Sequence, residues 1–129
     1  MDIREYMNKL VAEHAASEAC YNELAVTANQ QTQDVNNEYE KTGTVSRQSQ
    51  YRMRRARTFV MANLRRMISI RQDMIAIADL AGMSEMSARS RAVLVYFNQM
   101  KINEEMSMKE LALMHNLHAD AYQAFEDDE

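Results

Sequence analysis

The sequence predicts an all-α helical bundle built on a long antiparallel helical hairpin. Three observations support this prediction. The 129 residues contain no proline and only two glycines, Gly43 and Gly82. Strong helix formers dominate the composition, and apolar residues recur at helical spacing along most of the chain. A chain of this length buries roughly two thirds of its unfolded surface, so we expect a single domain over residues 1–129 that ends in an acidic tail at 126–129.

A first helix is expected over about residues 2–41. Apolar and small residues recur from Ile3 to Val35 in alternating steps of four and three, which is the spacing of one buried helix face. Beyond residue 28 the chain is polar and rich in Gln and Asn, so the periodicity places the helix end either near residue 30 or near residue 41. Gly43 permits the turn that follows.

A second helix is expected over about residues 46–81. Its apolar residues occupy a broad arc when they are placed at about 100° per residue, and such an arc suits a central helix with more than one neighbour. A group of arginines falls on the opposite side and is expected to be exposed. These residues are Arg47, Arg54, Arg55, Arg65 and Arg66.

Two shorter helices are expected over about residues 85–101 and 108–125. Gly82 stands where a left-handed cap would end the second helix. A break is expected near Asn103, because Ser107 and Glu110 have the spacing of a capping box that would begin a fourth helix.

The hairpin predicts which residues of the first two helices face each other. If the chain reverses at Gly43, facing residues have numbers that sum to about 86. His14 and Glu18 then lie near Arg71, which falls within the apolar arc of the second helix. Such a buried polar layer is typically structural and fixes the register of the helices, because any other pairing would bury an unpaired charge.

Charge is segregated along the chain, although the net charge is only −4. Residues 1–46 carry eight acidic and three basic residues, residues 47–101 carry three acidic and eleven basic residues, and residues 102–129 carry eight acidic and one basic residue. This layout indicates either that the chain folds its own acids onto its arginines or that it presents the arginines to a partner.

The favoured functional hypothesis is a non-enzymatic regulatory or accessory protein that docks on a larger macromolecular partner. The arginines at 47, 54, 55, 65 and 66 would contact an acidic protein surface of a host or cellular machine. Exposed Met and Leu would add apolar anchoring, since the chain has twelve methionines. A phage accessory factor would fit the size and composition.

One alternative is a nucleic-acid-binding protein that uses the same arginines, together with Arg52, on phosphates. The segment Ile77–Leu94 resembles the helix-turn-helix of repressors of the lac type through the spacing of Ala78, Gly82 and Ser84. The resemblance covers some eighteen residues and implies DNA contacts by Arg89 and Arg91. The motif is degenerate, because Ala88 and Arg91 stand at positions where that family carries core residues.

A second alternative is a structural subunit that self-assembles into an oligomer through the apolar stripe of the first helix. Catalytic motifs are lacking, so the sequence predicts no enzyme, no cofactor and no metal site, and His115 with His118 is interpreted as a surface pair. The lone Cys20 and the absence of a signal-peptide pattern favour a reducing, cytoplasmic location. No apolar run approaches the roughly twenty residues that span a bilayer, so no membrane partner is expected.

Overall fold

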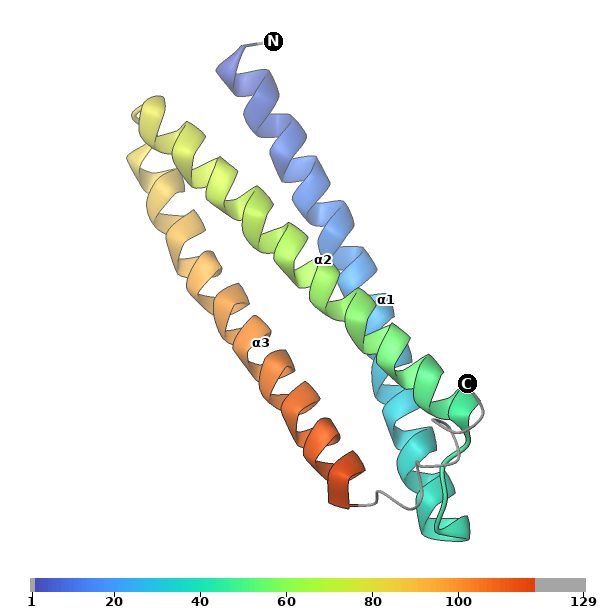
Figure 1. The fold of residues 1–129 in the computed structure, drawn as a ribbon. Coiled ribbons are helices and arrows are strands. Elements are labelled where there is room, and N and C mark those ends of the chain that lie inside the picture. The colour runs from blue at the N-terminus through green and yellow to red at the C-terminus, as the bar shows by residue number, and fades with distance from the viewer. Residues whose placement is uncertain (1, 118–129) are drawn as a thin grey trace.

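The protein is an all-α helical bundle of three long helices in the computed structural model (Figure 1). The structure describes the backbone of residues 2–117 and the side chains of residues 2–111. The helices are α1 (Ile3–Thr42), α2 (Arg47–Leu80) and α3 (Ser84–Leu117). No strand occurs in the described part of the chain. The predicted fold class is therefore confirmed.

Helix α2 is the central element of the bundle, as the breadth of its apolar arc predicted. Both α1 and α3 pack extensively against α2, whereas the backbones of α1 and α3 approach each other in few places. Figure 1 shows the chain reversing direction at each turn, so that each neighbour runs back along α2. The largest fully buried side chains of α2 are Met53, Val60, Leu64 and Met67.

Helix α1 continues to Thr42, so the later of its two predicted ends is correct. Asp2 caps its first turn by accepting a hydrogen bond from the Glu5 backbone N–H at 2.8 Å. The polar second half stays helical because it still buries side chains, with Val35 only 1% exposed. At the other end Gly43 adopts φ +72° and donates its N–H to the Tyr39 carbonyl at 2.7 Å, which ends the helix.

The connection between α1 and α2 is tied to both helices. Val45 is buried in a small apolar cluster with Val35 and Met53. The Ser46 side chain caps α2 by accepting from the Ser49 backbone N–H, and the Ser46 N–H donates to Glu38 Oε1 at 2.6 Å. The short turn therefore has a defined conformation.

The contacts between α1 and α2 agree with an antiparallel hairpin of the expected register. Met7 and Leu10 pack with Met74 and Ala78, and Ala28 packs with residues of α2 nearer its start. The buried residues of the apolar stripe of α1, such as Met7 and Leu10, are therefore covered within the molecule. Self-assembly through this stripe, which the sequence suggested, stays a prediction.

Helix α3 differs from its prediction, because the expected break near Asn103 does not occur. Residues 102–107 are helical, and Ser107 with Glu110 lies inside α3 rather than at the start of a fourth helix. Glu104 forms an ion pair with α2 on one side of this segment, and Leu111 packs on the cluster that holds Val45. These contacts hold the helix together through a locally polar sequence. Residues 118–125 of the predicted fourth helix lie outside the described part of the chain.

Candidate functional site

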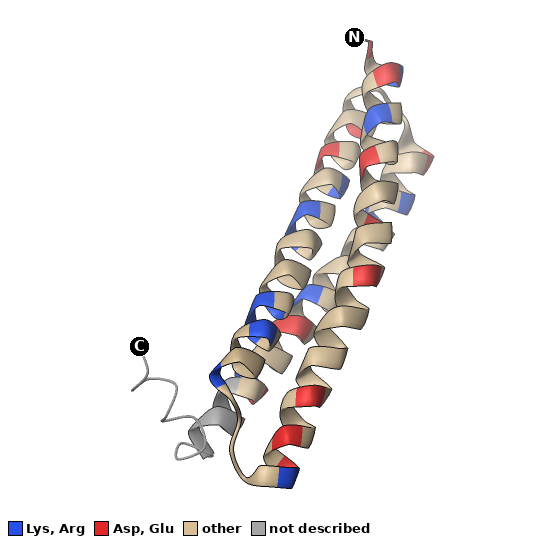
Figure 2. Ribbon diagram, turned by 90° about the vertical axis from the view of Figure 1, so that its right-hand side faces the viewer, with Lys and Arg blue, Asp and Glu red and all other residues tan. Residues whose placement is uncertain are grey.

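The five arginines predicted to bind a partner are all exposed on α2, and we call them the arginine surface. They are Arg47, Arg54, Arg55, Arg65 and Arg66. Figure 2 shows bands of basic residues recurring along α2, whereas the lower half of α1 carries acidic bands. At about 1.5 Å per residue the surface is roughly 28 Å long. Its exposure follows from the apolar arc on the opposite side, which α1 and α3 cover.

Three members of this surface are not neutralised by the chain's own described carboxylates. Within residues 2–111, Arg55, Arg65 and Arg66 form no ion pair. The guanidinium of Arg55 instead lies over the Phe59 ring, 5.4 Å from its centroid. These three cationic groups are thus available to an external anion.

Two aromatic rings accompany the arginine surface. Phe59 lies at the edge of the contact with α1, and its side chain is 46% exposed. Tyr51 is 60% exposed. A shallow hollow of about 210 Å³ lies between α1 and α2, where Leu24 faces Arg52, Arg55 and Phe59.

A second hollow lies on the other side of the arginine surface, between α2 and α3. It has a volume of about 360 Å³ and includes Met61, Arg65 and Met108 in its lining. Met108 is 37% exposed. Apolar side chains therefore flank the arginines on both sides of α2.

Of the three further arginines proposed to contact nucleic acid, Arg52 is exposed, but Arg89 and Arg91 are paired with acids of the chain. Arg89 forms an ion pair with Glu85 one turn earlier in α3. Arg91 Nη2 lies 2.6 Å from Asp79 Oδ2 across the turn. These pairs reduce the charge that Arg89 and Arg91 offer to phosphates.

The resemblance of residues 77–94 to a helix-turn-helix is not matched by the geometry. A recognition helix crosses its predecessor at about 90–120°, whereas α3 runs back along α2 and packs on it (Figure 1). Gly82 adopts φ +70°, as its predicted role as a left-handed cap requires. The glycine closes a tight turn between two antiparallel helices, so this helix-turn-helix interpretation is wrong.

A polar layer joins α1, α2 and α3 near the α2–α3 turn, as the hairpin register predicted for His14 and Arg71. Arg71 Nη2 lies 3.3 Å from His14 Nε2, and Arg71 Nη1 donates to Ser90 Oγ at 3.4 Å. His14 Nδ1 lies 3.8 Å from Glu18 Oε2. Burial and then the Arg71 charge lower the pKa of His14, and Glu18 opposes them in part.

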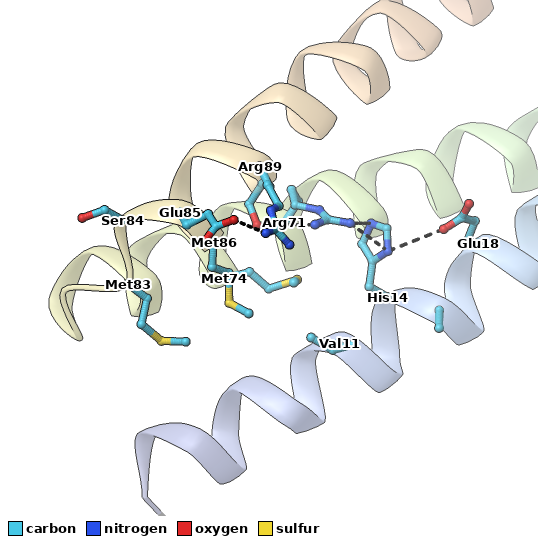
Figure 3. Close-up of a pocket in the computed structure, with 12 residues that line it drawn as sticks. Val11, His14, Glu18, Arg71, Met74, Met83, Ser84, Glu85, Met86 and Arg89 are labelled. Carbon is cyan, nitrogen blue, oxygen red and sulfur yellow. Dashed lines mark hydrogen bonds and ion pairs between the residues drawn. The ribbon is translucent and has the colours of Figure 1, made fainter.

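The same layer borders a groove with a volume of about 640 Å³ (Figure 3). The groove lies between the first half of α1 and the start of α3, with α2 as its floor. Burial lowers the pKa of Arg71, and the charge of Glu18 opposes this in part. Arg71 Nε has no hydrogen-bond partner.

A second polar layer at Arg57 was missed by the sequence interpretation. Arg57 Nη1 lies 3.2 Å from Glu104 Oε2, and the two side chains are only 12% and 11% exposed. Arg57 also donates to Thr32 Oγ1 at 3.2 Å and to Asn29 Oδ1 at 3.0 Å. This arginine therefore joins all three helices and is structural. The sequence contained one indication of this structural role, because Arg57 falls in the apolar arc of α2 instead of on the arginine surface.

Among the described residues, no group of three or more His, Cys, Asp or Glu side chains is arranged to hold a metal ion. His115 and His118 lie outside the residues whose side chains are described. None of the helices, over the described part of the chain, combines the length and the apolar character needed to cross a bilayer.

No protein-family model matches the chain, and no curated protein or solved structure shows significant similarity to it.

Proposed function

We propose that the protein is a non-enzymatic accessory protein that docks on an acidic surface of a larger protein partner through its arginine surface. The observation that supports this proposal is the exposure of Arg55, Arg65 and Arg66 on one side of α2 with no ion pair to a described carboxylate. Guanidinium groups match carboxylates in a bidentate geometry. A protein with net charge −4 that keeps this surface basic is suited to a localised acidic target.

Apolar groups beside the arginines support docking on a protein. Interfaces are enriched in aromatic residues, Met and Arg, and a few of these residues supply most of the binding energy. Phe59 lies next to Arg55 on the α1 side, and Met108 lies next to Arg65 on the α3 side. In this proposal the arginines orient the partner, while Phe59 and Met108 supply apolar contact area.

The proposal is tested by capture of partners from nuclease-treated lysate of the source cells. The test variant carries Arg55→Glu, Arg65→Glu and Arg66→Glu. The control variant carries Arg4→Glu, Lys9→Glu and Arg89→Glu, which change the net charge equally at exposed positions elsewhere. We expect wild type and control to retain the same specific protein and the test variant to lose it. Retention by the test variant would refute the proposal.

Nucleic-acid binding is the second candidate, and the exposed rings favour it. Bases stack on aromatic side chains while cations contact the phosphates, and Tyr51, Phe59 and Arg55 lie on the same part of α2. Affinity for a duplex or single strand should then fall with salt, with a slope of about −0.9 per phosphate contact on duplex and about −0.7 on single strands. Absence of a gel shift at low salt would exclude this candidate.

A further inference from the structure

The groove beside Arg71 is built from all three helices and lies apart from the arginine surface. Figure 3 shows Val11, His14 and Glu18 of α1 on one side of the groove. Residues from Met83 in the α2–α3 turn to Arg89 in the first turns of α3 lie on the other side. Its volume of about 640 Å³ falls in the range of roughly 300–1,000 Å³ that is typical of small-molecule sites. The groove therefore has room for an organic ligand.

Arg71 gives this groove a positive charge, which Glu18 offsets in part without contacting the guanidinium. The hydrogen-bond partners of Arg71 are the Ser90 hydroxyl and the His14 ring, and no described carboxylate lies within ion-pairing distance of it. Its Nε is buried without a partner. A partly buried cation that no carboxylate contacts is unfavourable, whereas a carboxylate can accept two parallel hydrogen bonds from a guanidinium.

The two acidic residues at the groove each lie near another side chain of the protein. Glu18 lies 3.8 Å from the His14 ring, and Glu85 is paired with Arg89 at the rim. These two carboxylates would repel a multiply charged anion, because both border the same groove as Arg71. A single negative charge is the best match to Arg71, the arginine of the groove that no described carboxylate contacts.

Apolar side chains line the remainder of the groove. Val11 comes from α1, Met74 from α2, Met83 from the turn between α2 and α3, and Met86 from the start of α3. Val11 and Met83 are 44% and 38% exposed. Methionine side chains adapt to ligands of varied shape, so this wall suits an unbranched apolar chain.

We propose that the groove binds a small amphipathic monocarboxylate. Its carboxylate would contact the Nη atoms of Arg71 and the Ser90 hydroxyl, and its apolar chain would lie along Met83 and Met86. This site is independent of the proposed docking through the arginine surface, so the failure of one proposal leaves the other standing.

The test uses octanoate as the probe and the full-length protein. Calorimetric titration measures affinity for wild type, Arg71→Gln and the matched control Arg65→Gln, whose arginine lies outside the groove. We expect Arg71→Gln to weaken binding by at least about tenfold, which corresponds to the loss of a charge-assisted hydrogen bond. The Arg65→Gln variant should bind as wild type does, and octan-1-ol should bind wild type far more weakly than octanoate. Equal affinity of octanoate for Arg71→Gln, or of octan-1-ol for wild type, would overturn the proposal, as would failure of wild type to bind octanoate.

A second variant covers the case in which Arg71→Gln fails to fold. Ala15→Trp places a large ring in the groove from an exposed position of α1, without changing any charge. We expect it to abolish octanoate binding, and unchanged binding would overturn the proposal. Nuclear magnetic resonance gives the location, because saturation with octanoate should shift the His14 ring and Met83 methyl signals. Shifts confined to residues outside the groove would contradict the assignment.

Discussion

Arg57 and Glu104 form a buried ion pair that joins α2 to α3 at the level where α1 also contacts Arg57. The side chains are 12% and 11% exposed, and the shortest N–O distance between them is 3.2 Å. Thr32 and Asn29 accept further hydrogen bonds from the same guanidinium. The pair therefore ties the middle of α3 into the bundle.

Removal of either partner of this pair should strongly destabilise the protein. Arg57→Ala or Glu104→Ala leaves an uncompensated buried charge, which typically costs about 3–5 kcal/mol. The double variant Arg57→Met with Glu104→Leu should recover most of this loss, since no charge remains buried. Urea unfolding measures each free energy. As a control, Arg91→Ala breaks an exposed pair and should cost less than about 1 kcal/mol. Additive losses in the double variant would contradict the burial argument.

His14 should make stability depend on pH. Burial and the nearby Arg71 lower the pKa of His14 below its ordinary value of 6.5, so the unfolded chain takes up this proton more readily than the folded protein. The His14 contribution to stability should therefore fall as pH drops below about 6.5 and should level off below the folded pKa. Subtracting the stability-versus-pH curve of His14→Gln from that of wild type cancels the contributions of the titrating groups that the two proteins share. A flat difference between pH 7.5 and pH 4 would show that the pKa of His14 is not lowered.

Glu38 should stabilise the connection between α1 and α2. As with His14, this contribution to stability should fall as the pH drops, but here the folded protein favours the charged form of the side chain. A hydrogen bond from the Ser49 side chain lowers the pKa of Glu38 most, burial opposes it, and hydrogen bonds from Ser46 add to the lowering. The ionised form is thus favoured in the folded state. We expect Glu38→Gln to cost about 1 kcal/mol at pH 7. This difference should shrink as pH falls below the ordinary value of 4.5 and through the lowered pKa, and a difference that grows in acid would contradict the assignment.

Gly43 should be required for its backbone conformation alone. It adopts φ +72°, and an added Cβ would have no atom within 4 Å. Gly43→Ala should therefore cost about 1–2 kcal/mol from the left-handed conformation, and Gly43→Asn should cost less. Thermal unfolding at fixed pH gives both values. Equal stability of the two variants would mean that the turn relaxes to another conformation.

Periodicity predicted α1 and α2 well because both helices bury a regular face. The stripe from Ile3 to Val35 and the arc on α2 are direct consequences of packing α1 and α3 against one central helix. The positive φ values of Gly43 and Gly82 were predictable, since glycine tolerates that region best. The contact between His14 and Arg71 followed from the register of a hairpin with its reversal at Gly43.

Features that depend on tertiary contacts were not predictable in the same way. The polar residues around Asn103 indicated a helix end, but the ion pair of Glu104 with Arg57 holds that segment in α3. The spacing of Ala78, Gly82 and Ser84 serves an antiparallel turn as well as a helix-turn-helix, because spacing alone does not determine the angle between helices. The pairing of Arg89 with Glu85 was predictable from their separation of four residues on one helix. The pairing of Arg91 with Asp79 was not, because it depends on how the turn between α2 and α3 is folded.

The central position of α2 has a consequence for hydrogen exchange. Middle residues such as Leu64 and Met67 are fully buried between two neighbours, so their amides become accessible only when both neighbouring helices detach. The first turns of α1 carry exposed Ile3 and Tyr6, so they can open locally. Amide protection should therefore rise from the outer helices toward the middle of α2, where exchange should require global unfolding.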